Sequence, residues 1–91
     1  MDLYHLQSEI TSRYPHFSVA YEESPFGESI TVQQGKSIIA NLNHQYNSND
    51  YILTHQGKVD TCPSEGDARS QLMQILDKGK KRGLFGMLTG R

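Results

Sequence analysis

The residue types that most often define a chemistry are scarce in this chain of 91 residues. There is no tryptophan, and the single cysteine, Cys62, excludes an intramolecular disulfide and favours a reducing compartment. No apolar run approaches the ~18 residues that a membrane-spanning helix needs. The N-terminus has neither the basic segment nor the long apolar stretch of a secretory signal. We therefore expect a cytoplasmic protein of a bacterium or of an infected host cell.

Motifs for metal binding, cofactor binding and catalysis are also missing. The cysteine and the four histidines show no Cys-x-x-Cys and no His-x-x-x-His spacing. Segment 83–86, Gly-Leu-Phe-Gly, lacks the preceding strand and the following Lys-Ser/Thr of a phosphate-binding loop. Cys62 and His55 could pair as nucleophile and base, but nothing marks an oxyanion hole beside them. The sequence predicts a protein that is not an enzyme and binds no cofactor or metal.

The first apolar residues have helical spacing. Leu3, Leu6 and Ile10 follow one stripe, and Pro15 ends the pattern because the residue before a proline is displaced from the α region. This predicts a helix over about 2–13. At this chain length, about 60–65% of the unfolded surface can be buried, which allows one domain with a small core.

A second helix is indicated after the cysteine. Ser64 is a suitable N-cap, and Asp67 three residues later gives a weak form of the capping box. The buried stripe of this helix consists of Ala68, Leu72, Ile75 and Leu76. Gly79 is a plausible terminator, since glycine favours helix ends.

Between the two helices the apolar period changes to two. Phe17, Val19 and Tyr21 alternate with polar residues, and turns separate further alternating segments. A long polar loop is expected over 43–50. Short connections require antiparallel neighbours, so the predicted fold is α+β: an antiparallel four- to five-stranded meander flanked by an N-terminal and a C-terminal helix (α-β-β-β-β-α), with both helices on one face. The expected core comprises Leu3, Leu6, Ile10, Phe17, Val19, Ile30, Val32, Ile38, Leu53, Leu72, Ile75 and Leu76.

This order of elements is similar to that of double-stranded-RNA-binding domains. That family has a lysine pair and an alanine-rich start to its second helix, where this chain has Ser64-Glu65-Gly66-Asp67-Ala68. Acidic residues at a helix start disfavour contact with phosphate. The layout, small size and lack of catalytic motifs are also similar to phage-encoded inhibitors such as anti-CRISPR proteins, a likeness of architecture that involves no specific residues.

Two segments of the predicted meander have the composition of a binding surface. Glu22, Glu23 and Glu28 flank the turn that carries Phe26, and Tyr46 lies in the middle of the long polar loop. Exposed aromatic residues anchor protein interfaces, and charges steer the encounter of partners. An acidic rim around an aromatic residue therefore favours recognition of a basic protein surface, against the alternative of a solvated turn and a flexible connection.

The C-terminal residues differ in charge from the rest of the chain. Residues 1–76 carry four basic and nine acidic side chains, a formal −5, whereas residues 77–91 carry five basic and one acidic, a formal +4. We divide the chain into a single α+β domain, 1–82, and an apolar and basic C-terminal tail, 83–91. The tail can cover the domain itself, enter a partner groove or join two copies as a homodimer. Its apolar side chains are Leu84, Phe85, Met87 and Leu88.

The sequence thus predicts a small non-enzymatic protein-binding module, such as a phage- or mobile-element-type inhibitor or adaptor of a larger complex. The alternative is a nucleic-acid-binding protein that uses its basic C-terminal segment, since each neutralised phosphate releases counterions. The other interpretations of these charges are a solubilising helix end, contact with anionic lipid and contact with an acidic protein surface. The basic side chains concerned are Lys78, Lys80, Lys81 and Arg82.

Overall fold

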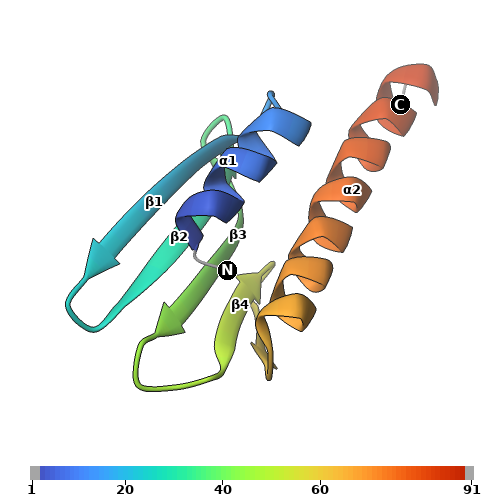
Figure 1. Cartoon of the computed structure of the whole chain (residues 1–91). Helices are drawn as coiled ribbons and strands as arrows, with labels where there is room; N and C mark the ends of the chain where they lie inside the picture. Colours follow the sequence, from blue (N-terminus) through green and yellow to red (C-terminus); the bar gives the residue numbers. More distant parts are fainter. Residues whose placement is uncertain (1–2, 90–91) are drawn as a thin grey trace.

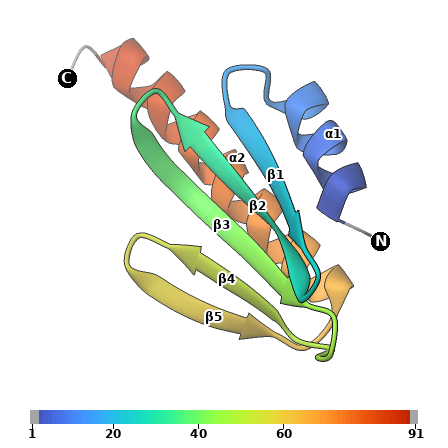
Figure 2. The same cartoon turned by 90° about the vertical axis from the view of Figure 1, so that its left-hand side faces the viewer.

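A computed structural model of the protein describes residues 3–89, with side chains described as far as Lys78. Its elements are α1 (Leu3–Arg13), β1 (Ser18–Ser24), β2 (Gly27–Gln34), β3 (Ser37–Gln45), β4 (Tyr51–His55), β5 (Lys58–Cys62) and α2 (Glu65–Thr89). The five strands form one sheet in the order β1-β2-β3-β4-β5, and each neighbouring pair is antiparallel. The predicted α+β meander is confirmed, with both helices on one face (Figures 1 and 2).

The core lies between the two helices and the face of the sheet that they cover. Ile30, Leu42 and Leu53 form one row across β2, β3 and β4, and each is fully buried. Burial of such a side chain contributes about 1.5–3 kcal/mol. The expected core residues that are buried are Leu3, Leu6, Ile10, Phe17, Ile30, Val32, Leu53, Leu72 and Leu76, and Val19 and Ile75 are partly buried against them.

The prediction that Ile38 is a core residue is wrong, because a β-bulge interrupts the alternation of side chains. The register of β2 on β3 shifts between Val32 and Gln33, so that Val32 pairs with Ala40 and Gln33 pairs with Ile38. Ile39 is the extra residue, and it packs partly buried against the core. Ile38 therefore points away from the helices and is 64% exposed.

Two predicted boundaries also differ from the structure. β3 continues to Gln45, because its last residues pair with the first residues of β2, so the loop before β4 spans 46–50 and not 43–50. α2 continues past Gly79 to Thr89. A glycine inside a helix costs only about 1 kcal/mol relative to alanine, so it weakens a helix without necessarily ending it.

Side chains cap both helices and join them to each other. The Ser64 hydroxyl accepts a hydrogen bond from the Asp67 amide at 3.2 Å, which confirms Ser64 as the N-cap of α2. Arg69 of α2 donates to the Glu9 carboxylate of α1, with one contact at 3.2 Å from Nε. The Tyr14 hydroxyl after α1 donates to Asp77 of α2. Position 2, where the first helix is expected to begin, lies outside the described residues.

The meander brings the β1–β2 turn and the β3–β4 loop to one end of the sheet and the other turns to the opposite end (Figure 1). The two ends carry charge of opposite sign. We call one end the acidic end; it contains the β1–β2 turn, the β3–β4 loop and the first turn of α2, with Glu23, Glu28, Asp50, Glu65 and Asp67. The opposite, basic end contains the last turn of α1 and the β2–β3 and β4–β5 turns, with Arg13, Lys36 and Lys58. No helix of the described residues is long and apolar enough to cross a membrane.

Candidate functional site

The pairing of β2 with β3 brings two predicted binding residues side by side at the acidic end. Gly27 pairs with Gln45 at the end of this ladder. One residue further on, the Tyr46 amide donates a hydrogen bond to the Phe26 carbonyl oxygen at 2.9 Å. The Phe26 side chain is 81% exposed and that of Tyr46 is 50% exposed. Two aromatic side chains that are 20 positions apart in the sequence thus belong to one surface, which we call the Phe26–Tyr46 surface.

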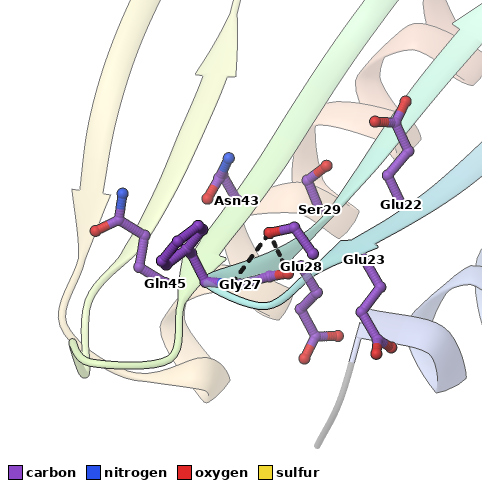
Figure 3. A pocket seen from close by; sticks show the side chains of 9 residues that line it. Glu22, Glu23, Gly27, Glu28, Ser29, Asn43 and Gln45 are labelled. Atoms are coloured by element: carbon purple, nitrogen blue, oxygen red, sulfur yellow. Dashed lines mark hydrogen bonds between the residues drawn. The ribbon is translucent and has the colours of Figure 1, made fainter.

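Hydrogen bonds between the Ser24 hydroxyl and the main chain fix the turn that carries Phe26. The Ser24 hydroxyl accepts a hydrogen bond from the Phe26 amide at 3.2 Å and donates one to the Gly27 carbonyl oxygen at 3.3 Å (Figure 3). At Gly27 the chain runs so close to β3 that an added Cβ would collide with the His44 carbonyl oxygen. A side chain at this position would push the turn away from β3. The exposed phenyl ring of Phe26 therefore projects from a turn whose backbone conformation is fixed by hydrogen bonds and by close packing on β3.

The loop that carries Tyr46 is held in a similar way. The Ser48 amide donates to the Gln45 carbonyl oxygen at 3.1 Å, and the Ser48 hydroxyl accepts from the Asp50 amide at 3.1 Å. The His44 ring donates a hydrogen bond from Nε2 to the Ser48 carbonyl oxygen at 2.9 Å and stacks on Tyr51, with 4.2 Å between ring centroids. These contacts tie the loop to the strands on both sides of it.

Burial raises the pKa of Tyr51 above its ordinary value, and the nearby carboxylates of Glu65 and Glu28 add to this effect. The hydroxyl, which is protonated at neutral pH in any tyrosine, therefore stays protonated to a higher pH than usual. Because it bears no charge, this residue can serve as a stacking platform for His44 without repelling the acidic side chains around it.

Glu22 and Glu23 lie beside the turn and point to opposite faces of the sheet, because successive strand residues alternate (Figure 3). Glu22 lies on the open face, opposite Ser29 of β2. Glu23 points toward the helices, where its carboxylate accepts a hydrogen bond from the Tyr21 hydroxyl at 2.8 Å. This hydrogen bond is the main cause of the raised pKa of Tyr21. Both glutamates are exposed at the acidic end, as the sequence predicts.

Glu28 does not belong to the exposed acidic rim, contrary to the expectation from the sequence. It is only 9% exposed, and its Oε1 accepts a hydrogen bond from the Leu3 amide at 2.6 Å. This amide is the first of α1, whose own first turn has no acidic residue. A negative charge at this position satisfies a free helix N–H and favours the helix dipole. The side chain of Glu28 therefore caps α1.

The surface of the acidic end is hollowed on both sides of Phe26. One hollow, about 200 Å³ in volume, lies beside the hairpin (Figure 3). Its lining residues are Glu22, Glu23, Ser24, Phe26, Gly27, Glu28, Ser29, Asn43 and Gln45. A second hollow, about 300 Å³, is lined by Pro25, Phe26, Gln45, Tyr46 and Asn47. Phe26 and Gln45 line both. Sequence reasoning missed Ser29, Asn43 and Gln45, which join the site only through the register of β2 on β3.

The structure does not assemble the nucleophile and base considered from the sequence. Cys62 ends β5 beside Tyr51, whereas His55 ends β4 beside Lys58, at the opposite end of the same hairpin. Cys62 is fully buried, and this burial raises the pKa of its thiol and so disfavours the reactive thiolate. Among the described residues, no group of three or more His, Cys, Asp or Glu side chains could hold a metal ion.

The predicted residues of the C-terminal segment, which lie between positions 78 and 88, fall within α2. The Lys78 side chain is exposed. The other predicted side chains of this segment lie outside the described residues, namely Lys80, Lys81, Arg82, Leu84, Phe85, Met87 and Leu88. Their proposed contacts with a partner, with nucleic acid or with a second copy remain predictions.

Comparison of the chain with models of protein families, with curated proteins and with solved structures gave no significant match.

Proposed function

We propose that this protein is a small non-enzymatic protein-binding module and that it binds its partner through the Phe26–Tyr46 surface. The observation that carries this proposal is the 81% exposure of Phe26 beside the half-exposed Tyr46 on a hydrogen-bonded backbone. Burial of an exposed phenylalanine side chain in a partner would contribute about 1.5–3 kcal/mol to the binding free energy. Aromatic side chains in this position are typical anchors of protein interfaces.

The held backbone of the two loops supports the same function. Binding normally costs free energy because loops and side chains become ordered, and this cost is smaller when the free protein already holds the bound geometry. Ser24 and Gly27 fix one loop, and the main-chain bond from Tyr46 to Phe26 joins it to the other. The surface is thus suited to act as a unit, as required of an inhibitor or adaptor that docks on a larger complex.

The charge of the acidic end indicates what kind of protein surface it binds. Glu22 and Glu23 are exposed beside Phe26, and Asp50 is the last residue of the loop that carries Tyr46. Complementary charge speeds association and suppresses wrong partners, while the aromatic anchors supply most of the affinity. We therefore expect the partner to present a basic surface with a depression that receives Phe26.

The test compares two single substitutions of exposed apolar residues. Phe26→Ala removes the proposed anchor, whereas Val59→Ala changes a residue of β5 that is 66% exposed and lies outside this surface. Tagged proteins are used to recover partners from the source cell, and the affinity for the recovered partner is then measured. We expect Phe26→Ala to weaken binding at least about tenfold and Val59→Ala to leave it unchanged, since anchor residues typically contribute about 2 kcal/mol or more. Equal binding by both variants would refute the proposal.

A second candidate function is nucleic-acid binding at the basic end. Arg13, Lys36 and Lys58 gather there from three separate segments. Such binding would contact phosphates, would weaken steeply with salt and would show little sequence preference. A fluorescence anisotropy titration of the Lys36→Glu, Lys58→Glu double variant tests it. Affinity for nucleic acid equal to that of the parent at low salt would remove this candidate.

A further inference from the structure

We propose that the hollow between Glu22 and Phe26 receives an arginine side chain of the partner, an inference that rests on the proposed function. The hollow opens on the face of the sheet that the helices leave uncovered. At about 200 Å³ it is smaller than the ~300–1,000 Å³ typical of sites for small-molecule ligands. Its size therefore suits the head group of one inserted side chain.

The charge of this face selects a cation. The residues of the open face are mostly serine, threonine, asparagine and glutamine. Where this face is formed by β1, β2 and β3, Glu22 is its single ionised side chain. Its row continues through Ser29 of β2 to Asn43 of β3. Glu22 has no hydrogen-bond or ion-pair partner among the described residues, whereas Glu23 already holds the Tyr21 hydroxyl. Glu23 and Glu28 also line the hollow, but Glu23 points to the other face and accepts from Tyr21, and Glu28 accepts from the Leu3 amide (Figure 3). The carboxylate left free for a cation is therefore that of Glu22.

The arrangement of the other groups favours a guanidinium over an ammonium ion. Phe26 supplies an exposed aromatic ring, and a planar guanidinium stacks on such a ring. Asn43 and Gln45 have amide oxygens and Ser29 has a hydroxyl, so several acceptors line the hollow together with Glu22. A guanidinium has five donors in one plane and can use several of these acceptors together. An ammonium ion is a compact charge without a flat face to stack.

The test uses amide chemical shifts of the isotope-labelled protein. It is titrated with three short blocked peptides, Gly-Arg-Gly, Gly-Lys-Gly and the neutral isostere Gly-citrulline-Gly. We expect the arginine peptide to shift the amides of Gly27, Ser29 and Asn43 most strongly. The shifts should be lost in Glu22→Gln and kept in Glu23→Gln, which removes the same charge from the other face of the same strand. Equal shifts with citrulline or lysine, no shift with arginine, or loss in both variants would overturn the inference.

The partner experiment separates a failure of this inference from a failure of the proposed function. If Phe26→Ala abolishes partner binding, Glu22→Gln should weaken it on the order of tenfold and Glu23→Gln should not, as expected for loss of one charge-assisted contact. If Phe26→Ala abolishes binding and Glu22→Gln has no effect, the protein-binding function stands and the arginine site is refuted. If Phe26→Ala has no effect, both are refuted.

Discussion

Replacement of Glu28 by alanine should destabilise the domain, although glutamate is usually a surface residue. Its carboxylate accepts a hydrogen bond from the Leu3 amide at 2.6 Å, and the residue is only 9% exposed. A hydrogen bond to a charged group contributes about 1.5–3 kcal/mol, and loss of a helix N-cap costs about 0.5–2 kcal/mol. These figures describe the same contact and are not additive, so we expect a loss of about 2 kcal/mol. In a domain of this size such a loss lowers Tm by roughly 8–16 °C.

Thermal and urea unfolding, followed by circular dichroism, measure this effect. Glu28→Gln keeps an acceptor oxygen and loses the charge at the helix N-terminus, which is worth about 0.3–1 kcal/mol, so its Tm should lie between those of the parent and Glu28→Ala. Glu22→Ala is the control, because substitution of an exposed glutamate changes stability by less than about 0.5 kcal/mol. If Glu28→Ala and Glu22→Ala unfold at the same temperature, the carboxylate of Glu28 does not cap α1.

Three further substitutions or reactions test the core and the contacts between the helices. Leu72→Ala should lower the free energy of unfolding by about 2–5 kcal/mol, since Leu72 is fully buried, and an unchanged urea midpoint would mean that α2 does not pack on the sheet. Burial and the hydrogen bond to Asp77 raise the pKa of Tyr14 above 10.0, so its stabilising contribution is complete below pH 10 and is lost as the pH rises further. Tyr14→Phe should therefore lose less stability than the parent between pH 9 and 11, and equal losses would contradict this. Cys62 should react slowly with a thiol reagent in the native protein and fully in denaturant, because burial removes access and raises its pKa; rapid native labelling would show that the β5 end opens readily.

Local patterns in the sequence were sufficient to predict the elements and their order. The spacing of Leu3, Leu6 and Ile10, the stop at Pro15 and the N-cap at Ser64 each depend on neighbouring residues, and the structure confirms the helix and the cap that they predict. Short turns between strands leave antiparallel neighbours as the available pairing. These features gave the meander and the side on which the helices pack.

The arrangement of the site depended on long-range register, which the sequence does not display. Next to the Gly35 turn, Gln34 of β2 pairs with Ser37 of β3. The bulge beyond Gln33 shifts by one residue every pair that lies farther from this turn. A shift of one residue exchanges the two faces of a strand. The exposure of Ile38 and the proximity of Gly27 to Gln45 both follow from this bulge. The burial of Glu28 could not be predicted either, since it depends on where the first amide of α1 lies.

The segregation of charge between the two ends of the sheet gives the molecule an electric dipole, although its formal net charge is −1. The longest strand, β3, has nine residues and spans roughly 30 Å, which is several times the Debye length of about 8 Å at physiological salt, so the two ends act on their surroundings almost independently. Near a basic partner, the molecule would be turned so that its acidic end leads before any contact forms. The association rate should therefore fall as salt increases, while the dissociation rate changes little. A nearly neutral protein would then associate with the kinetics of a strongly charged one.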